Sequence, residues 1–438
     1  RQNPVIVSNK PGIRIIGAME GVSPEPGAVS TQETIICRNV LYTTRLMTIN
    51  LTDLSAWRIV FEGGYLNSYG ADGGAVYADN SSSVRFYECI FRNNGINAQS
   101  MEEGGGLYIS GGNLLVTNCV FYTNYLSKAS WDTSAHGGAI AVKNCSYKIV
   151  NSLFMGNWIW TRHYDAFGAG IYINGGSGLV ASCTFTNLEC KLDTDAGASG
   201  YGYGGAIYLS GSDGLLCNSE FRNCRITGYP AGTYRRGTAV FASSGRLWRN
   251  IFDGNGHVNN GYATVVLSGS ASISNCLIAR TVAEHGIGCM GGTPSVINCT
   301  VSYAAGWGIT NSAGTVPIIR NCIAWGNMGG GIGVNGMTTY SCSQTPLVGD
   351  GNISANPLFV DTTYFHLKSR TRNYINGYFS GGEWEKSAEH SPCIDGGDPS
   401  DGRQNEPSPN GSRINMGCYG NTETADKAFL TATILLVR

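Results

Sequence analysis

Gly73-Gly74-Ala75-Val76 is followed, fifteen residues after Gly74, by Cys89-Ile90-Phe91-Arg92-Asn93-Asn94, and this pairing recurs along the chain. The glycine steps stand at 73–75, 104–106, 137–139, 168–170 and 204–206, and the phenylalanines follow at Phe91, Phe121, Phe154, Phe185 and Phe221. Successive phenylalanines are 30, 33, 31 and 36 residues apart, whereas Cys276, Cys299 and Cys322 are spaced by 23. A fixed period of this size is typical of a solenoid, and the shorter turns leave room for strands but not for a pair of helices.

Each repeat reads as strand, bend, strand and connecting segment. In the stretch from Leu114 to Phe121 apolar residues alternate with polar ones, which predicts a strand with one buried face. An asparagine marks the bend, and we expect its amide to bond to the equivalent amide of the next coil. The glycine steps are expected to supply unusual φ values where the chain re-enters the wall. The bend asparagines are Asn118, Asn151, Asn218, Asn275, Asn298 and Asn321.

The chain has 15 cysteines, and most are placed as structural residues. Six of them occupy the same position in different coils and are expected to form a buried, reduced, inward-facing ladder. No Cys-x-x-Cys pair supports a zinc site. Cys190 with Cys224, or Cys393 with Cys418, remain possible disulfides, because sequence alone does not fix connectivity. The ladder cysteines are Cys89, Cys119, Cys183, Cys276, Cys299 and Cys322.

Composition narrows the class of protein. Glycine makes up 62 of 438 residues, without a Gly-X-Y triplet, and charged residues are only 13% of the chain. Lys and Arg number 29 against 30 Asp and Glu, so there is no electrostatic case for nucleic acid as a partner. No stretch approaches the ~18 apolar residues of a membrane span. The chain begins Arg1-Gln2-Asn3-Pro4, without an initiator Met or a signal peptide, and we expect a processed product.

Two parts of the sequence carry a resemblance to known proteins. The combination of Gly-Gly-Ala-Ile with Phe-x-x-Asn, at 91–94, 121–124, 154–157 and 252–255, resembles the repeats of right-handed parallel β-helix surface proteins, including polymorphic outer-membrane adhesins. The stretches 352–361, 391–399 and 413–420 are similar to the terminal module of secreted bacterial β-helix proteins. The resemblance implies an exported bacterial protein at the cell surface or outside the cell.

The expected architecture is all-β: a right-handed parallel β-helix of about ten or more coils with lateral loop insertions. The coil is expected over residues 1–352, with long-loop coils at about 67–237 and short-loop coils at about 238–352. Residues 353–438 are expected to form a capping module near an anchor.

The long coils carry insertions between Phe-x-x-Asn and Gly-Gly, at roughly 95–103, 125–136, 158–167, 188–203 and 226–236. We expect them to emerge as loops along one edge, where they would bind a glycan or a protein partner. The alternative is that their aromatic residues only pack the loops against one another. The candidate ligand-binding residues are Trp131, Trp158, Trp160, Tyr164, Tyr201, Tyr203, Tyr229 and Tyr234.

Two functions from different classes remain open. The first is a non-catalytic surface or matrix protein that binds a glycan or a cell-surface protein, or that self-associates. The second is a polysaccharide lyase or glycoside hydrolase acting at the same edge, although a pectinase-like motif set is absent. Weak catalytic candidates are Arg162, His163, Asp193, Asp195, Arg235 and Arg236. No cofactor is expected, although calcium is possible at Asp193 and Asp195 or at Asp395, Asp398 and Asp401.

Overall fold

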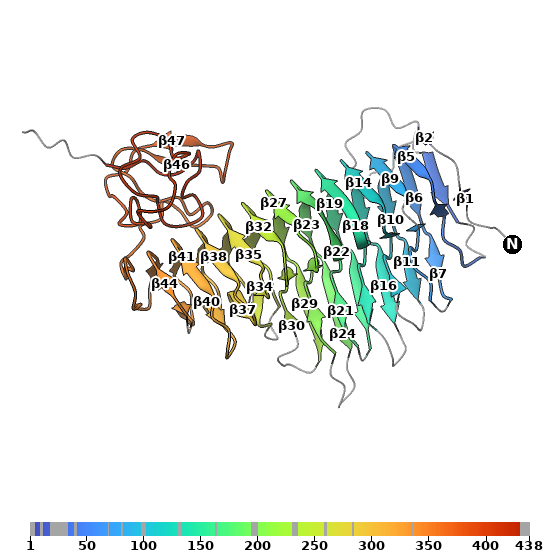
Figure 1. The fold of residues 1–438 in the computed structure, drawn as a ribbon, viewed down its shortest axis with the longest axis horizontal. Coiled ribbons are helices and arrows are strands. Elements are labelled where there is room, and N and C mark those ends of the chain that lie inside the picture. The colour runs from blue at the N-terminus through green and yellow to red at the C-terminus, as the bar shows by residue number, and fades with distance from the viewer. Residues whose placement is uncertain are drawn as a thin grey trace, which may run out of the picture.

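The computed structural model describes residues 5–8, 12–17, 34–38, 42–68, 70–79, 82–97, 102–128, 134–162, 164–193, 200–229, 235–257, 261–282, 284–334 and 336–429. Within these residues every regular element is a strand, and nearly all strand pairs are parallel. The chain winds into a rod of stacked coils, with the N-terminal coils at one end and a separate C-terminal module at the other (Figure 1).

Two sheets run along the rod and pair equivalent strands of successive coils. Sheet A has 22 strands, two short ones in most coils and a single long one at β18 and at β22, and sheet B has 12 strands, one per coil. The strands of sheet A are β1 (Val5–Ser8), β2 (Ile13–Ile16), β4 (Met47–Asn50), β5 (Asp53–Trp57), β8 (Val76–Asp79), β9 (Ser83–Tyr87), β13 (Leu107–Ser110), β14 (Asn113–Thr117), β18 (Ile140–Val150), β22 (Ile171–Ala181), β26 (Ile207–Ser210), β27 (Leu215–Cys217), β31 (Val240–Ala242), β32 (Arg246–Trp248), β34 (Ala263–Ser268), β35 (Ser272–Ser274), β37 (His285–Met290), β38 (Ser295–Ile297), β40 (Trp307–Asn311), β41 (Ile318–Arg320), β43 (Gly330–Gly333) and β44 (Thr338–Thr339). Those of sheet B are β3 (Thr34–Cys37), β6 (Ile59–Glu62), β10 (Ile90–Arg92), β15 (Val120–Tyr122), β19 (Leu153–Met155), β23 (Thr184–Thr186), β28 (Glu220–Arg222), β33 (Ile251–Asp253), β36 (Leu277–Ala279), β39 (Thr300–Ser302), β42 (Ile323–Trp325) and β45 (Cys342–Ser343).

We expected the insertions of the long coils to be loops. Instead they contribute two further parallel sheets. Sheet C consists of β7 (Tyr65–Leu66), β11 (Gly95–Asn97), β16 (Tyr125–Lys128), β20 (Trp158–Thr161), β24 (Glu189–Asp193) and β29 (Arg225–Tyr229). Sheet D consists of β12 (Glu102–Glu103), β17 (Ala135–His136), β21 (Ala166–Phe167), β25 (Gly202–Tyr203) and β30 (Arg235–Arg236). The long coils therefore have four walls. The coils after β30 keep only sheets A and B among the described residues.

The core is a set of columns in which equivalent residues stack from coil to coil. Seven phenylalanines of sheet B, from Phe61 to Phe252, are fully buried, and neighbouring rings lie 4.6 to 4.9 Å apart. This spacing is the distance between parallel strands, so the repeated Phe of the sequence is the inward residue of each rung. The stacked rings explain why the Phe position is kept while the lengths of the other segments vary.

The cysteine ladder is confirmed as buried and free of disulfides, and its thiols also bond to the backbone. The sulfur of Cys119 accepts a hydrogen bond from the amide of Cys89 at 3.4 Å, and Ser152 Oγ accepts one from the amide of Cys119 at 3.1 Å. Ser219 and Asn250 take the same position in later coils. The position therefore requires a side chain that accepts a hydrogen bond from a backbone N–H. A purely apolar side chain has no such acceptor.

The asparagine ladder expected at the bend is present only in the short coils, where Asn321 Nδ2 donates to Asn298 Oδ1 at 3.3 Å. The bend asparagines have positive φ throughout, but Asn118 of a long coil is exposed and its amide makes no rung-to-rung bond. A second ladder is formed by the last residue of Phe-x-x-Asn, between sheets B and C. Asn94 Nδ2 donates to Asn124 Oδ1 at 2.9 Å, and Asn124 Nδ2 donates to Asn157 Oδ1 at 3.0 Å. All three are fully buried, because the amide faces the interior at this corner.

The end of the coil is closed by side chains that take the place of a further rung. Ser343 Oγ accepts a hydrogen bond from the amide of Ile332 at 3.0 Å. Gln344 Oε1 accepts from the amide of Asn327 at 2.8 Å, and its Nε2 donates to the carbonyl of Asn327 at 2.7 Å. The open strand edge of the last coil is thereby satisfied by the chain that immediately follows it.

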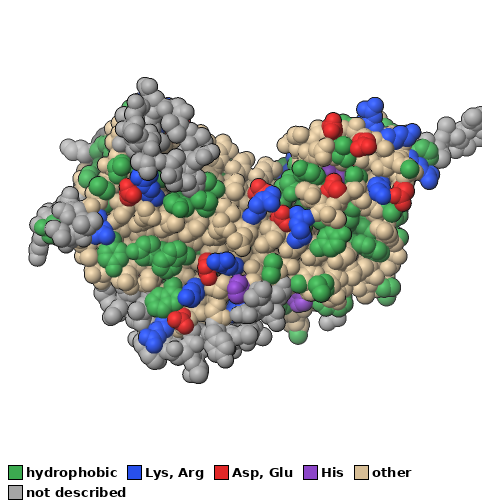
Figure 2. Space-filling view, turned by 180° about the vertical axis from the view of Figure 1, so that it is seen from behind, with side chains coloured by type: hydrophobic (Ala, Val, Ile, Leu, Met, Phe, Trp, Pro, Cys, Tyr) green, Lys and Arg blue, Asp and Glu red, His purple; other side chains and the backbone are tan. Residues whose placement is uncertain are grey.

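The C-terminal module lies along the side of the last coils, on the outer face of sheet B. Ile323 packs in one apolar cluster with Leu367 and Met416, and Leu277 packs in another with Tyr419. The module contains a small antiparallel pair, β46 (Asn373–Ile375) and β47 (Glu383–Glu385). A notch separates the module from the neighbouring part of the rod (Figure 2).

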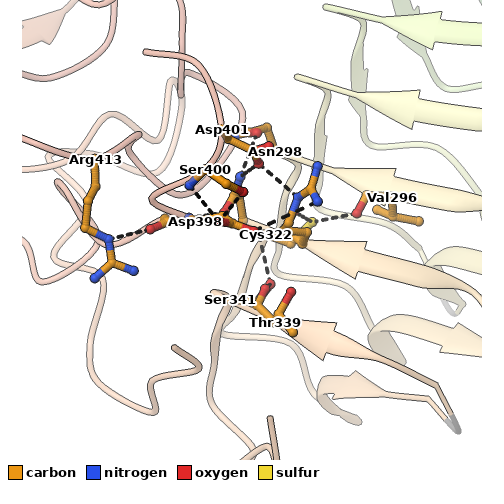
Figure 3. A network of polar contacts seen from close by, with 12 residues as sticks. Val296, Asn298, Cys322, Thr339, Ser341, Asp398, Ser400, Asp401 and Arg413 are labelled. Carbon is orange, nitrogen blue, oxygen red and sulfur yellow. Dashed lines mark hydrogen bonds and ion pairs between the residues drawn. The ribbon is translucent and has the colours of Figure 1, made fainter. Parts of the chain in front are cut away.

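Bend asparagines of the short coils hold this module. Asn298 Nδ2 donates to the carbonyls of Asn415 at 3.1 Å and Gly417 at 3.3 Å. Asn321 Nδ2 donates to Asp401 Oδ2 at 2.7 Å. Figure 3 shows Asp398, Ser400 and Asp401 of the module beside Asn298 and Cys322 of the coil. The same bend residue is thus exposed in the long coils and a docking contact in the short ones.

Candidate functional site

An aromatic row lies on the outer face of sheet C. In the register of this sheet Tyr65, Gly95, Tyr125 and Trp158 occupy equivalent positions, and Leu66, Ile96, Leu126 and Ile159 point inward beside them. The rings of Tyr125 and Trp158 are stacked, with centroids 4.8 Å apart and planes 8° from parallel. Both rings are half-buried, as is Trp160 in the next outward column. We call Tyr65, Tyr125, Trp158 and Trp160 the sheet C row.

The sheet C row ends at a group of charged residues. Glu189 follows Trp158 in the register, and its carboxylate accepts from Arg225 Nη2 at 2.9 Å and from the hydroxyl of Thr227. Burial alone would raise the pKa of Glu189, but the bonds to Thr227 and Arg225 lower it below its ordinary value. Lys191 lies exposed beside Trp160. Figure 2 shows hydrophobic side chains close to acidic and basic ones on the rod. Aromatic rings next to paired charges suit a polar, hydroxylated ligand.

A second aromatic group lies where sheet D meets sheet A. Tyr203 stacks on Phe167 with centroids 5.0 Å apart, and it contacts the edge of Phe241 at 5.0 Å. The guanidinium of Arg236 lies 5.0 Å from the ring of Tyr201 and 5.6 Å from that of Tyr203. We call this group the corner cluster. Its ring faces contact one another, so part of the predicted recognition surface is used for packing.

Four titratable residues lie in earlier coils of the same corner. Glu103 accepts from His136 Nδ1 at 2.6 Å and lies 3.0 Å from Lys143 Nζ, while its amide donates to Asp72 Oδ1 at 2.9 Å. Burial, reinforced by the charge of Glu103, raises the pKa of Asp72 to about 7. Burial alone would raise the pKa of Glu103 as well, but His136 and Lys143 lower it. The surroundings thus shift the pKa values of the two carboxyl groups in opposite directions.

The structure divides the predicted ligand-binding residues between two sheets. Trp158 and Trp160 belong to the sheet C row, Tyr201 and Tyr203 to the corner cluster, and Tyr164 is exposed between β20 and β21. They therefore do not form the single edge that we expected, because sheets C and D present their outer residues to different sides. Tyr229 lies in β29. Trp131 and Tyr234 lie outside the described residues.

The weak catalytic candidates are not brought together. Asp193 is exposed at the end of β24, Arg162 follows β20, and His163 and Asp195 lie outside the described residues. Arg235 is 2% exposed and points inward from sheet D, whereas Arg236 points outward. No shared site of these groups exists in the described part of the chain.

Metal and disulfide candidates have other partners. Within the described ranges no group of three or more His, Cys, Asp or Glu side chains is arranged to hold a metal ion. Asp401 Oδ2 lies 2.9 Å from Arg320 Nε, and Asp398 Oδ2 lies 3.9 Å from Arg320 Nη1, so these carboxylates join the module to the coil. Burial raises the pKa of Asp395. All fifteen cysteines are free, so neither suggested disulfide is present.

Several residues of these surfaces were missed by sequence reasoning. Tyr65 precedes the first recognised insertion, and Asp72 and Glu103 lie just before the glycine steps. The sequence did contain a pattern that could have indicated both acids. Asp72 and Glu103 each stand directly before a Gly-Gly pair, at the point where sheet D meets sheet A. Glu284, a buried acid with no equivalent in other coils, left no such signal.

Comparison with known proteins agrees with this architecture. Residues 138–345 match a family model described as a right handed beta helix region. The fold is a right-handed parallel β-helix. Searches of curated proteins and of solved structures gave no match. In the part of the chain that the structure describes, no helix has the length and apolar character needed to cross a membrane.

Proposed function

We propose that this β-helix is a non-catalytic bacterial protein, exported to the cell surface or the extracellular matrix, that binds a glycan along the sheet C row. The observation that carries the proposal is the stacked, half-exposed pair Tyr125 and Trp158, which ends at the Glu189–Arg225 ion pair. Sugar rings combine apolar faces with hydroxyl groups, and such a row offers both apolar contact and hydrogen-bonding partners.

The repeat explains how such a row is built. Outward positions of parallel strands recur at about 4.8 Å, so identical side chains in successive coils form a continuous strip. Gly95 interrupts the strip and leaves space that the ring of Tyr125 fills, since a Cβ at Gly95 would lie 2.3 Å from that ring. An extended glycan would therefore run along the rod, from Tyr65 towards Lys191.

A glycan array followed by calorimetry with the double variant Trp158→Ala and Trp160→Ala tests this function. We expect binding of the selected glycan to weaken at least about tenfold, or about 1.4 kcal/mol. The matched control is Trp57→Ala, since Trp57 stacks on Tyr87 at 4.9 Å on sheet A. It should lower thermal stability similarly and leave binding unchanged. Normal binding by the double variant contradicts the proposal.

A second candidate function, polysaccharide cleavage, is favoured by Asp72 and Glu103. Glycoside hydrolysis requires two carboxyl groups of unequal pKa, and here the pKa of Asp72 is raised while that of Glu103 is lowered. The variant Asp72→Asn separates the two functions. If polysaccharides are degraded by the wild-type protein and not by this variant, the protein is an enzyme, whereas absence of new chain ends with the wild-type protein supports binding alone.

A further inference from the structure

The last coil and the C-terminal module each contribute one cysteine to the contact between them. Cys342 lies in β45, directly after Ser341, whose Oγ accepts a hydrogen bond from the amide of Cys322 in the position of the cysteine ladder. In the register of sheet B Cys342 follows Ile323, so it belongs to the outward column that the module covers. Cys342 therefore does not continue the inward ladder but faces the module.

Cys393 of the module meets Cys342 at this contact. Both side chains are fully buried and pack in the apolar cluster around Ile323. The Cys393 thiol forms a hydrogen bond with the sulfur of Cys342, which itself donates to the carbonyl of Ala355 at 3.1 Å. The two sulfur atoms are therefore in contact across the boundary between coil and module, and both thiols are free.

The surroundings make the two thiols unequal. The hydrogen bond from Cys393 lowers the pKa of Cys342, although burial opposes this change. Burial, reinforced by the hydrogen bond to Cys342 and by its charge, raises the pKa of Cys393. Cys342 is thus the thiol that ionises first, and it is a thiolate rather than a thiol that attacks a disulfide.

We propose that Cys342 and Cys393 are a site of oxidative modification, at which a disulfide bond joins the last coil to the module. The oxidant is a low-molecular-weight disulfide, such as oxidised glutathione. The Cys342 thiolate attacks one of its sulfurs, forms a mixed disulfide and releases one thiolate. Cys393 then loses its proton, and its sulfur attacks that of Cys342, which forms the protein disulfide and releases the second thiolate. Two electrons pass from the protein to the oxidant, which is reduced to two thiols.

The position between coil and module distinguishes this pair from the other sulfur contacts. Thiols of the inward ladder, such as those of Cys299 and Cys322, also form hydrogen bonds with each other, but they lie inside the coil. An oxidant reaches them only when the coil unfolds. Cys342 and Cys393 are uncovered when the module leaves sheet B, and local opening of this kind needs less free energy than global unfolding.

Peptide mapping by mass spectrometry without a reducing agent tests the proposal. The full chain is incubated in its folded state with oxidised and reduced glutathione at mildly alkaline pH, where thiolates form. We expect one linked pair of peptides, Cys342 with Cys393, while the inward ladder stays reduced. Because the mapping uses the wild-type chain, its result does not depend on the folding of a variant. Free thiols at both positions, or a different pairing of either one, overturn the proposal.

Hydrogen exchange in residues 357–428 measures what the bond does. Since a covalent link opposes separation of the module from the coil, we expect oxidation to slow this exchange at least about tenfold, and dithiothreitol to reverse the effect. Cys393→Ser should show no response to the oxidant, whereas Cys418→Ser should respond as the wild type does. Cys418 is the matched control because it is buried in the same contact, where its amide donates to Thr300 Oγ1 at 3.0 Å. Equal responses of the two variants overturn the proposal.

Discussion

The long coils before Arg236, here called wide, have four sheets, and the short coils after it, here called narrow, have two. The two regions share sheets A and B and differ in what is attached to these sheets. Sheets A and B continue through both regions, but the inward Phe column ends at Phe252 and is continued by Ile278, Val301 and Ala324 in the narrow coils. The wide coils add sheets C and D, whereas the narrow coils carry the C-terminal module on the outer face of sheet B. Two walls therefore define the coil, and the remaining chain of each repeat is available for other surfaces.

The buried asparagine corner continues into the narrow coils at Asn327, but the bend asparagines are used differently in the two regions. In the wide coils the buried amides of Asn94, Asn124 and Asn157 bond to one another and turn the chain from sheet B into sheet C. In the narrow coils the bend amides of Asn298 and Asn321 bond to the module. Stability of the wide region should therefore depend on the interior of the coil, and that of the narrow region on the contact with the module.

The largest effect is expected for Asn124→Ala. Asn124 Nδ2 donates to the carbonyl of Phe91 at 2.8 Å, and its Oδ1 accepts from the amide of Asn94 at 3.2 Å. The substitution leaves several buried groups unpaired, at about 1–3 kcal/mol each, so we expect a loss of at least about 3 kcal/mol in denaturant unfolding. Asn118→Ala, at an exposed bend, is the control and should lose about 1 kcal/mol. Equal losses would contradict the distinction between the two corners.

The second prediction concerns the pH dependence of stability, which Glu284 should influence at the boundary between the two regions. Burial raises the pKa of Glu284 from 4.5 to about 8, with smaller opposing effects of Thr238, Thr264 and Arg235. The folded state therefore retains a proton that the unfolded state loses, and stability falls as pH rises between these two values, by at most about 1.4 kcal/mol per unit. Glu284→Gln should remove this part of the slope. Parallel stability curves for the variant and the wild type would show that the carboxyl group is not protonated in the folded protein.

A smaller effect is expected for Asn298→Ala, which removes two hydrogen bonds between the narrow coils and the module. We expect about 1–2 kcal/mol of local destabilisation and faster hydrogen exchange in residues 357–428. Asn151→Ala changes the same bend position in the wide region, where Asn151 is exposed, and should leave exchange in the module unchanged. If both variants behave alike, the bend amides do not hold the module.

The smallest difference between the two regions is expected for the alkylation of their buried cysteine thiols, which should be equally slow in both. Fourteen cysteines are buried and Cys37 is exposed. Native-state alkylation followed by mass spectrometry should label Cys37 first, while Cys119 of the wide region and Cys299 of the narrow region stay protected until unfolding. Rapid labelling of either would place the ladder on the wrong face of the strand.

Much of this fold was predictable because the repeat of Phe and Cys records the inward positions of sheets A and B directly. Sheets C and D were predicted as loops, since their strands are short and differ in sequence from coil to coil. Alternation was nevertheless present, as in Trp158-Ile159-Trp160-Thr161. The aromatic candidates were recognised by composition, but their division between two surfaces depends on strand facing. The buried carboxyl group of Glu284 bonds to Thr238 and Thr264 of other coils, and no local pattern contains these contacts.

The closing of the last coil by Ser343 and Gln344 has a consequence for how such a chain changes in length. Both side chains take the place of the missing rung, and the module that follows bonds to coils as far back as Arg249. Whole coils upstream of these contacts can then be deleted or duplicated without altering the closed end. Related chains that share this closed end can therefore differ in the length of the rod by whole coils, while the end itself stays the same.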